Sequence, residues 1–215
     1  MEIERALVMT SFNEKSKDAY NKKADGYDSS REGEFTRKFH RLLLSEIAWR
    51  ENYSVLDVAC GTGSLLAEMN ARKVIRGYGI DISDKMIINA IAKNPGMEFR
   101  TAGCEVIPFQ NDMADIIVVS AAYHHFPDVG AFAREAKRVI KPNGMLHIAD
   151  IYLPSLVRFV LNPFVPLILK DGDVKLYSPR EITHNFIRFG FEEVSVKITG
   201  NIQLVTMRKL SVSLL

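Results

Sequence analysis

The chain has 215 residues, of which 47% are hydrophobic and 25% are charged, and its formal net charge at pH 7 is +2. This length and composition predict one globular domain with a full hydrophobic core. The small net charge and the lack of a long Lys/Arg run argue against nucleic-acid binding driven by bulk electrostatics.

The cysteines and the first residues indicate the cellular compartment. Cys60 and Cys104 are too few for a disulfide framework and lack the spacing of a metal site, so they indicate a reducing compartment. The opening stretch, MEIERALVMTSFNEK, carries acids early and has no long apolar core, which argues against a signal peptide. We therefore expect a cytoplasmic protein with no stable membrane insertion.

The region before Ser54 is predicted to be helical and amphipathic. Apolar residues recur there at helical spacing, at Phe35, Phe39, Leu42, Leu43 and Ile47. We expect these helices to lie across the sheet that the following segments predict.

The stretch Ser54–Leu66, SVLDVACGTGSLL, predicts a strand, a tight turn and the start of a helix. Its apolar run is typical of a strand buried on both faces, as in parallel sheets. Gly61 and Gly63 allow a turn in which the backbone approaches a ligand with no Cβ in the way. An ordinary junction explains the glycines but not Asp57, a carboxylate inside an apolar strand. A nucleoside cofactor fits this shape.

The glycine pattern narrows the choice of cofactor. The dinucleotide fingerprint needs a third glycine where this chain has Leu66, and the P-loop lysine is absent. The run VLDVACGTG resembles motif I of class I S-adenosylmethionine-dependent methyltransferases, of the small, single-domain, UbiE-like (type 11) kind. The resemblance implies S-adenosyl-L-methionine as cofactor and S-adenosyl-L-homocysteine as product. It also implies that Asp57 holds the cofactor's ammonium group, directly or through water.

Two further segments around motif I resemble the same family. The backbone that would line the methionine part of the cofactor comprises Ala59, Cys60, Gly61, Thr62 and Gly63. The run AYNKKADGYD, residues 19–28, is similar to the lid segment that precedes motif I in many small methyltransferases, which implies that Tyr20 and Tyr27 close over the cofactor. The alternative is that these tyrosines only pack a helix.

Asp81 ends the next predicted strand, VIRGYGID, and lies 20 residues beyond Gly61. An acid at this strand end can accept hydrogen bonds from both ribose hydroxyls of an adenosine. Ile82 is expected to flank the adenine. The alternative role of helix N-cap fits Ser83 better, because the predicted helix Lys85–Lys93 begins close behind it.

The segment after the third predicted strand, residues 97–102, departs from the family pattern. GCEVIPFQ is similar to the family's G-D-A-x-x-L-P-F segment, in which an acid contacts the adenine amino group. Here Gly103 stands where the acid is expected and Cys104 follows it. Glu105 is close by, so the adenine contact is expected from Glu105 or from the backbone. Cys104 is expected to be a buried wall residue, since no activating base is near it in the sequence.

The fourth predicted strand, residues 115–120, leads into AAYHHFPD. The resemblance implies that the backbone at Ser120 and Ala121 passes close to the sulfonium. It makes Tyr123, His124 and His125 the candidates for positioning an acceptor, with at least one histidine holding the loop by hydrogen bonds. We expect no metal here, because no carboxylate or cysteine stands at ligand spacing and adjacent side chains point apart.

The rest of the chain predicts a helix over residues 131–140, a turn at 141–144, a fifth strand at 145–151 and, after a Ser178-Pro179 start, a helix to Arg188. A hairpin is predicted over residues 193–210 about Gly200-Asn201. The apolar stretch Tyr152–Lys170 is too short and too proline-broken for a membrane span. We expect residues 152–177 to form a cap of short helices whose apolar side chains face inward over the substrate pocket. The rival interpretation is a dimer interface.

These segments predict an α/β, doubly wound, Rossmann-like sheet with helices on both faces. The resemblance implies a single class I methyltransferase domain over residues 1–215, with an N-terminal helical lid at 1–50 and a seven-stranded, mostly parallel sheet whose last strand is antiparallel. It implies in-line methyl transfer to a small, partly apolar molecule, with no nucleic-acid partner, by a monomer or homodimer.

Two other function classes stay open. A Rossmann-type oxidoreductase would bind NAD(P) in place of S-adenosylmethionine. A non-catalytic S-adenosylmethionine-binding module is the second alternative, and the missing acid at Gly103 favours it.

Overall fold

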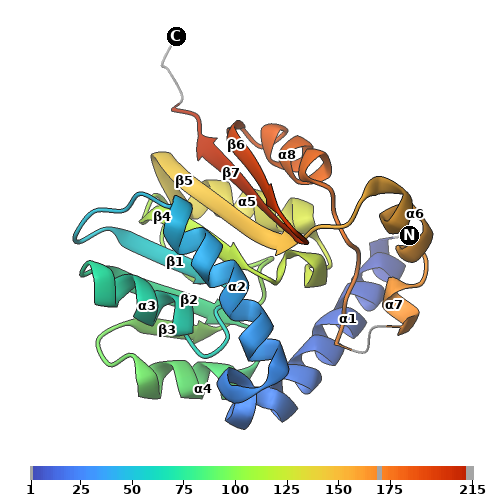
Figure 1. The fold of residues 1–215 in the computed structure, drawn as a ribbon, viewed down its shortest axis with the longest axis horizontal. Coiled ribbons are helices and arrows are strands. Elements are labelled where there is room, and N and C mark those ends of the chain that lie inside the picture. The colour runs from blue at the N-terminus through green and yellow to red at the C-terminus, as the bar shows by residue number, and fades with distance from the viewer. Residues whose placement is uncertain (1, 169–170, 212–215) are drawn as a thin grey trace.

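Strands and helices alternate along the chain (Figure 1), and the computed structural model describes residues 2–168 and 171–211. The described strands are β1 (Ser54–Val58), β2 (Arg76–Asp81), β3 (Glu98–Thr101), β4 (Ala114–Ser120), β5 (Ile140–Ile151), β6 (Phe191–Thr199) and β7 (Ile202–Lys209). The described helices are α1 (Glu2–Lys23), α2 (Arg31–Glu46), α3 (Ser64–Arg72), α4 (Asp84–Lys93), α5 (Val129–Val139), α6 (Ser155–Leu161), α7 (Val165–Ile168) and α8 (Pro179–Ile187). Two short 3-10 helices are η1 (Ala24–Ser29) and η2 (Tyr123–His125).

The described strands form one seven-stranded sheet in the order β3-β2-β1-β4-β5-β7-β6. β7 is antiparallel to its neighbours β5 and β6, whereas the other neighbouring strands pair in parallel. β1 lies at the centre and is buried at all its residues, as a strand covered on both faces must be. The predicted doubly wound sheet with an antiparallel last strand is confirmed.

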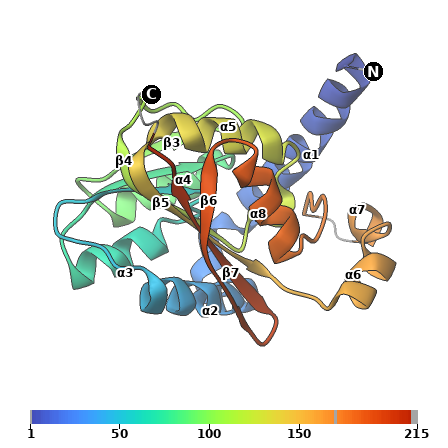
Figure 2. The same cartoon turned by 90° about the horizontal axis from the view of Figure 1, so that it is seen from above.

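Helices cover both faces of this sheet (Figure 2). One core packs α2, α3 and α4 against the sheet through Phe39, Leu66 and Ile87, among others. The other core packs α5 and α8 against the opposite face through Phe132 and Phe186. The apolar side chains of β1 alternate between the two cores, so both faces need a helical layer.

Two predicted boundaries differ from the structure. β2 begins at Arg76 and not at Val74, whose side chain is exposed. β5 begins at Ile140, before the predicted turn, because the strand continues on both sides of an irregularity opposite β4. Asn143 has φ of +62° there, the left-handed conformation that asparagine tolerates.

The apolar stretch after β5 does not face inward as predicted. In α6 the side chain of Phe159 is 80% exposed, and Phe164, just beyond it, is 51% exposed. The physical reason is that polar residues hold this segment to the rest of the chain: Arg158 lies near Glu181, and the Asn162 side chain bonds both backbone groups of Leu176. The apolar side of α6 is therefore turned outward. None of the described helices is long and apolar enough to cross a membrane.

Helix α8 begins with a complete capping box. The Ser178 hydroxyl accepts a hydrogen bond from the Glu181 backbone N–H, and the Glu181 carboxylate accepts one from the Ser178 backbone N–H. Pro179 at the first helical position completes the start that the sequence predicts.

Replacing Ser178 with alanine removes this cap, and we expect the free energy of unfolding to fall by about 1 kcal/mol. Ser195→Ala on β6 is the matched control, because its side chain is exposed and caps no helix. Urea unfolding of both variants measures the difference. Equal stability of the two variants would contradict the role given to the cap.

Candidate functional site

A cavity of about 390 Å³ lies where the carboxyl ends of β1, β2 and β4 meet α1, η1 and α2. The predicted site residues that line it are Tyr20, Tyr27, Asp57, Ala59, Cys60, Gly61, Thr62, Asp81, Ile82, Cys104, Ser120, Ala121 and His125. Asp57 and Ser120, which are far apart in the sequence, meet here because parallel strands present their carboxyl ends at the same edge of the sheet.

The turn after β1 exposes backbone to the cavity. Ala59, Gly61 and Gly63 all have positive φ, at +62°, +53° and +74°, so the chain turns sharply before α3. A Cβ on Gly61 would meet no atom within 4 Å, which means that this position opens onto free space. Gly63 has another role, since a Cβ there would meet Asn94 Nδ2 at 2.7 Å. Gly63 allows close packing of α3 and does not line the cavity.

Asp81 joins the ends of β1 and β2. Its carboxylate accepts hydrogen bonds from the backbone N–H of Gly61 at 2.9 Å and of Ser83 at 2.8 Å. Burial nevertheless raises the pKa of Asp81 to about 6, because these bonds offset only part of the lost hydration. The Ser83 hydroxyl accepts a hydrogen bond from the Met86 N–H and so caps α4. The N-cap of this helix is therefore Ser83 and not Asp81.

Three buried polar atoms in the cavity wall have no hydrogen-bond partner among the described residues. They are Oδ1 of Asp57, Oγ of Ser120 and Nδ1 of His125. Burial, together with the charge of Asp81, raises the pKa of Asp57 well above its ordinary value. Unpaired polar groups are costly inside a protein, so these atoms suit a polar ligand that supplies partners.

Residues before β1 close one side of the cavity. The Tyr20 hydroxyl lies 3.1 Å from Nε2 of His125, and the Tyr27 hydroxyl lies 3.0 Å from the Thr36 hydroxyl. The Thr62 hydroxyl of motif I donates to Oδ1 of Asp28 at 2.7 Å. These contacts tie the N-terminal helices to the ends of the strands.

Sequence reasoning missed two residues that line the cavity, Asp28 and Lys93. Their side chains form an ion pair with each other. The signal for Asp28 was available, because it directly follows Tyr27 in the lid segment. Lys93 carries no motif and reaches the cavity only because α4 packs beside η1.

The structure does not bring Gly103 or Glu105 to the cavity wall. The Glu105 carboxylate folds back over Gly103, and its Oε1 lies 3.5 Å from the Asn13 amide. Cys104 and Ala102 line the cavity in their place. Burial raises the pKa of the Cys104 thiol well above its ordinary value, which fits a wall residue and not a nucleophile.

The three acceptor-side candidates have different surroundings. Tyr123 is fully buried among aromatic rings of the core, including Phe132 and Phe186, and does not line the cavity. This position argues against the predicted role of Tyr123 in positioning an acceptor. His125 lines the cavity, and its pKa is lowered well below its ordinary value by burial and by His124, so its ring is neutral at pH 7.

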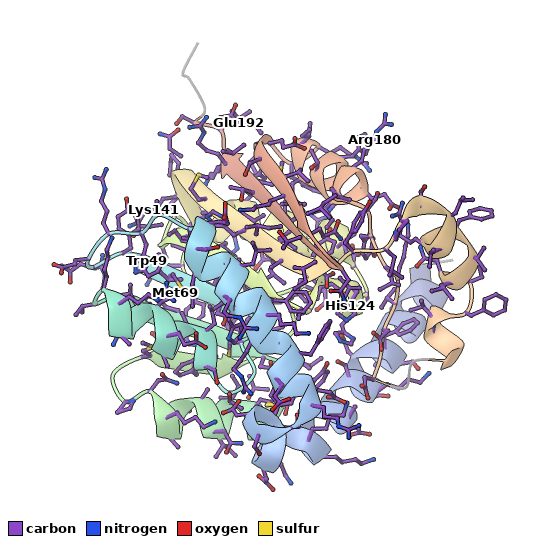
Figure 3. The ribbon with its side chains drawn as sticks, in the orientation of Figure 1. Trp49, Met69, His124, Lys141, Arg180 and Glu192 are labelled. Carbon is purple, nitrogen blue, oxygen red and sulfur yellow. The ribbon has the colours of Figure 1, made fainter. Side chains whose placement is uncertain are left out.

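His124, labelled in Figure 3, holds the loop by hydrogen bonds, as we expect of one histidine. Its Nδ1 lies 2.6 Å from Oδ1 of Asp150, and its backbone carbonyl accepts from the N–H of Val174. Burial alone lowers its pKa, but the charge and hydrogen bond of Asp150, together with Asp173, raise it. Sequence reasoning missed both acids, because they lie 26 and 49 residues beyond His124 and belong to no motif.

Comparisons with known proteins agree with this geometry. Residues 56–148 match the model of a family described as a methyltransferase domain. A ubiquinone/menaquinone biosynthesis C-methyltransferase of Geotalea daltonii is 30% identical over 131 residues, which are 57% of this chain and 56% of that protein. An uncharacterized methyltransferase of Bacillus subtilis is 31% identical over 119 residues, which are 53% of this chain and 47% of that protein. The chain thus spans about half the length of these relatives.

Solved structures share the fold. A putative methyltransferase of Haloferax volcanii, in complex with the activator Trm112, has a TM-score of 0.76 and 21% identity, covering 89% of this chain and 98% of that one. The YcgJ protein of Bacillus subtilis has a TM-score of 0.70 and 18% identity, and the match covers 81% of this chain and 99% of that one. The matched region runs from β1 to β5, and it contains motif I and the strand end with Asp81. Residues 56–148 of the chain thus resemble a methyltransferase domain, and the fold is that of these solved structures.

Proposed function

We propose that this chain transfers the methyl group of S-adenosylmethionine to a small, partly apolar acceptor. The observation that carries the proposal is the row of unpaired buried polar atoms along the cavity, from Asp57 through Ser120 to His125. The row begins beside motif I, where the cofactor is expected, and ends at the aromatic and histidine side of the cavity. The cofactor and the acceptor, bound side by side, would give Asp57 and Ser120 partners.

The cofactor would use the end of the cavity at β1 and β2. Asp81 would accept hydrogen bonds from the ribose hydroxyls, and Ile82 and Met86 would pack beside the adenine. Asp57 would pair with the ammonium group, whose positive charge favours the ionised carboxylate that burial disfavours. Gly61 would let the backbone approach the methionine part.

The acceptor would use the end formed by Tyr20, His125, Phe126 and Pro127. Its nucleophilic atom would attack the methyl carbon as the bond from carbon to sulfur breaks, leaving S-adenosylhomocysteine as a thioether. The protein's task is to align the two partners and exclude water. The neutral His125 can accept a hydrogen bond from an acceptor hydroxyl. The N-terminal helices, tied through Asp28 and Tyr20, would act as the lid.

The names of the relatives suggest an acceptor class. They include C-methyltransferases of ubiquinone/menaquinone biosynthesis and an O-methyltransferase of ubiquinone biosynthesis. We extend the proposal to a hydroxylated aromatic ring as the acceptor. Such a ring offers an apolar face to Phe126 and a hydroxyl to His125. We further propose that the protein works as a monomer or homodimer in the cytoplasm, where the buried, free Cys60 and Cys104 would stay reduced.

A second function without methyl transfer has one specific observation in its favour. A protein named as the [4+2]-cyclase SpnF shares this fold, with a TM-score of 0.68 and 14% identity. The cavity wall also lacks the acid that usually contacts the adenine. A dinucleotide oxidoreductase is less suited, because Leu66 fills the place of the third glycine and is fully buried in the core.

Asp81→Ala should weaken S-adenosylmethionine binding by about 1.5 to 3 kcal/mol, the range for a hydrogen bond to a charged group. Titration calorimetry measures the loss, and circular dichroism checks that the variant is folded. Unchanged affinity in a folded variant would show that the ribose does not bind at Asp81.

The raised pKa of Asp81 also predicts a pH dependence. Ribose hydroxyls donate to the ionised carboxylate, so wild-type affinity should hold above pH 7 and fall by up to about tenfold per pH unit below about 6. Asp81→Asn should lose this part of the dependence. Since the folded pKa lies above the ordinary value, ionising Asp81 costs stability as pH rises to about 6, so the Tm of the wild type without cofactor should fall over that range, and the Tm of Asp81→Asn should change less with pH.

Gly61→Val should abolish S-adenosylmethionine binding, because the side chain enters the free space at the turn and strains a residue with positive φ. Gly200→Val in the hairpin is the matched control: Gly200 has φ of +60° and open space around it but does not line the cavity. Normal binding by Gly61→Val, measured by calorimetry, would mean that motif I does not hold the cofactor.

Methyl transfer itself is tested with S-adenosylmethionine carrying an isotope-labelled methyl group and a panel of hydroxylated aromatic compounds. We expect label in an acceptor and equal release of S-adenosylhomocysteine, measured by mass spectrometry, and neither with Gly61→Val. Tight cofactor binding without turnover on the panel or on a cell extract of small molecules would favour the function without methyl transfer.

A further inference from the structure

Three side chains beside the acceptor end of the cavity form a cluster with metal-ligand chemistry. One ligand atom each from His124, His125 and Asp173 lies within 4.8 Å of the others. The histidines come from η2, and Asp173 comes from the segment that returns from α7 toward α8. The sequence hides this cluster, because the carboxylate lies 48 residues beyond His125.

The distances suit a single small cation. Oδ1 of Asp173 lies 3.5 Å from Nε2 of His124 and 3.8 Å from Nδ1 of His125. Zinc bonds of about 2.0 to 2.1 Å place tetrahedral ligand atoms roughly 3.3 Å apart, and both Asp173 distances lie close to that value. The two imidazole rings lie side by side, with centroids 4.2 Å apart. The expectation that these adjacent side chains point apart is therefore wrong.

The surroundings orient the ligand atoms. Asp150 holds Nδ1 of His124 at 2.6 Å, which leaves Nε2 of that ring directed at Asp173. A carboxylate behind a histidine in this way is the usual second shell of a metal-binding histidine. Nδ1 of His125 is buried without a hydrogen-bond partner in the described part of the chain, although the backbone of Gly172 is near enough to raise the pKa of His125, against the lowering by burial and by His124.

The charge balance favours a cation as well. Asp150 and Asp173 are both buried, and Oδ2 of Asp150 has no partner among the described residues. The neighbouring Lys23 already pairs with Asp171 and Glu32. A protonated His124 would neutralise one of the two buried carboxylates, whereas a divalent cation would neutralise both.

We propose that His124, His125 and Asp173 bind a divalent transition-metal ion, with zinc as the best match to two imidazoles and one carboxylate. Three protein ligands leave a coordination position open, as in catalytic zinc sites. That position would lie beside the cavity, because His125 also lines it. A metal there would bind an acceptor oxygen and lower the pKa of its hydroxyl. The metal site itself does not depend on the proposed methyl transfer.

Untagged protein, stripped with a chelator, tests the site by titration with Zn²⁺ against a chromogenic competitor and with Co²⁺ as a spectroscopic probe. We expect one equivalent of either ion, a visible Co²⁺ absorption, and a higher Tm with Zn²⁺ because the ion binds only the folded chain. Asp173→Asn, which is isosteric, should lose stoichiometric binding. Asp150→Asn keeps the three ligands and should weaken binding by about 10- to 100-fold.

His184→Ala and Asp171→Asn are the matched controls, because each removes a histidine or an acid outside the cluster and should bind Zn²⁺ as the wild type does. S-adenosylmethionine affinity, measured on Asp173→Asn, reports whether that variant is folded. The proposal fails if wild-type protein takes up no Zn²⁺ equivalent, or if folded Asp173→Asn binds Zn²⁺ as tightly as the wild type. If Asp173→Asn loses Zn²⁺ binding but transfers methyl groups at the wild-type rate, the metal site is supported but its role in the reaction is contradicted.

Discussion

The hydrogen bond from the Gly61 backbone N–H to Asp81 fixes the edge of the sheet on which the rest of the site depends. It joins the ends of β1 and β2, ties the turn of motif I to β2, and involves a buried carboxylate that lines the cavity. The cost of that burial appears in the raised pKa of Asp81. A polar cofactor would offset this cost.

Burial with incomplete hydrogen bonding recurs along the whole cavity. Asp57, Ser120 and His125 each present an unpaired polar atom from the end of a different strand or from the loop that follows. The N-terminal helices add polar contacts of their own, chiefly between Asp28 and Thr62. The N-terminal helices, which we propose as a lid, thus line the same cavity as the groups that need a ligand.

Much of the fold and of the cofactor side could be predicted, because these features depend on local sequence. A strand buried on both faces, a glycine turn and an acid at a strand end leave patterns of fixed spacing, and motif I and Asp81 were found in that way. The acceptor side depends on long-range packing. Asp173 meets His124 only because the chain returns from α7, and Tyr123 packs into the core although its neighbour in the sequence lines the cavity. The apolar side chains of α6 likewise face outward because Arg158 and Asn162 contact Glu181 and Leu176, which lie farther along the chain.

A crystal structure of the chain with S-adenosylhomocysteine tests the central claim most directly. The account predicts the ribose hydroxyls within hydrogen-bond distance of Asp81, the ammonium group at Asp57, and the sulfur directed toward His125. A ligand found outside the cavity, or one whose ribose makes no contact with Asp81, would contradict it.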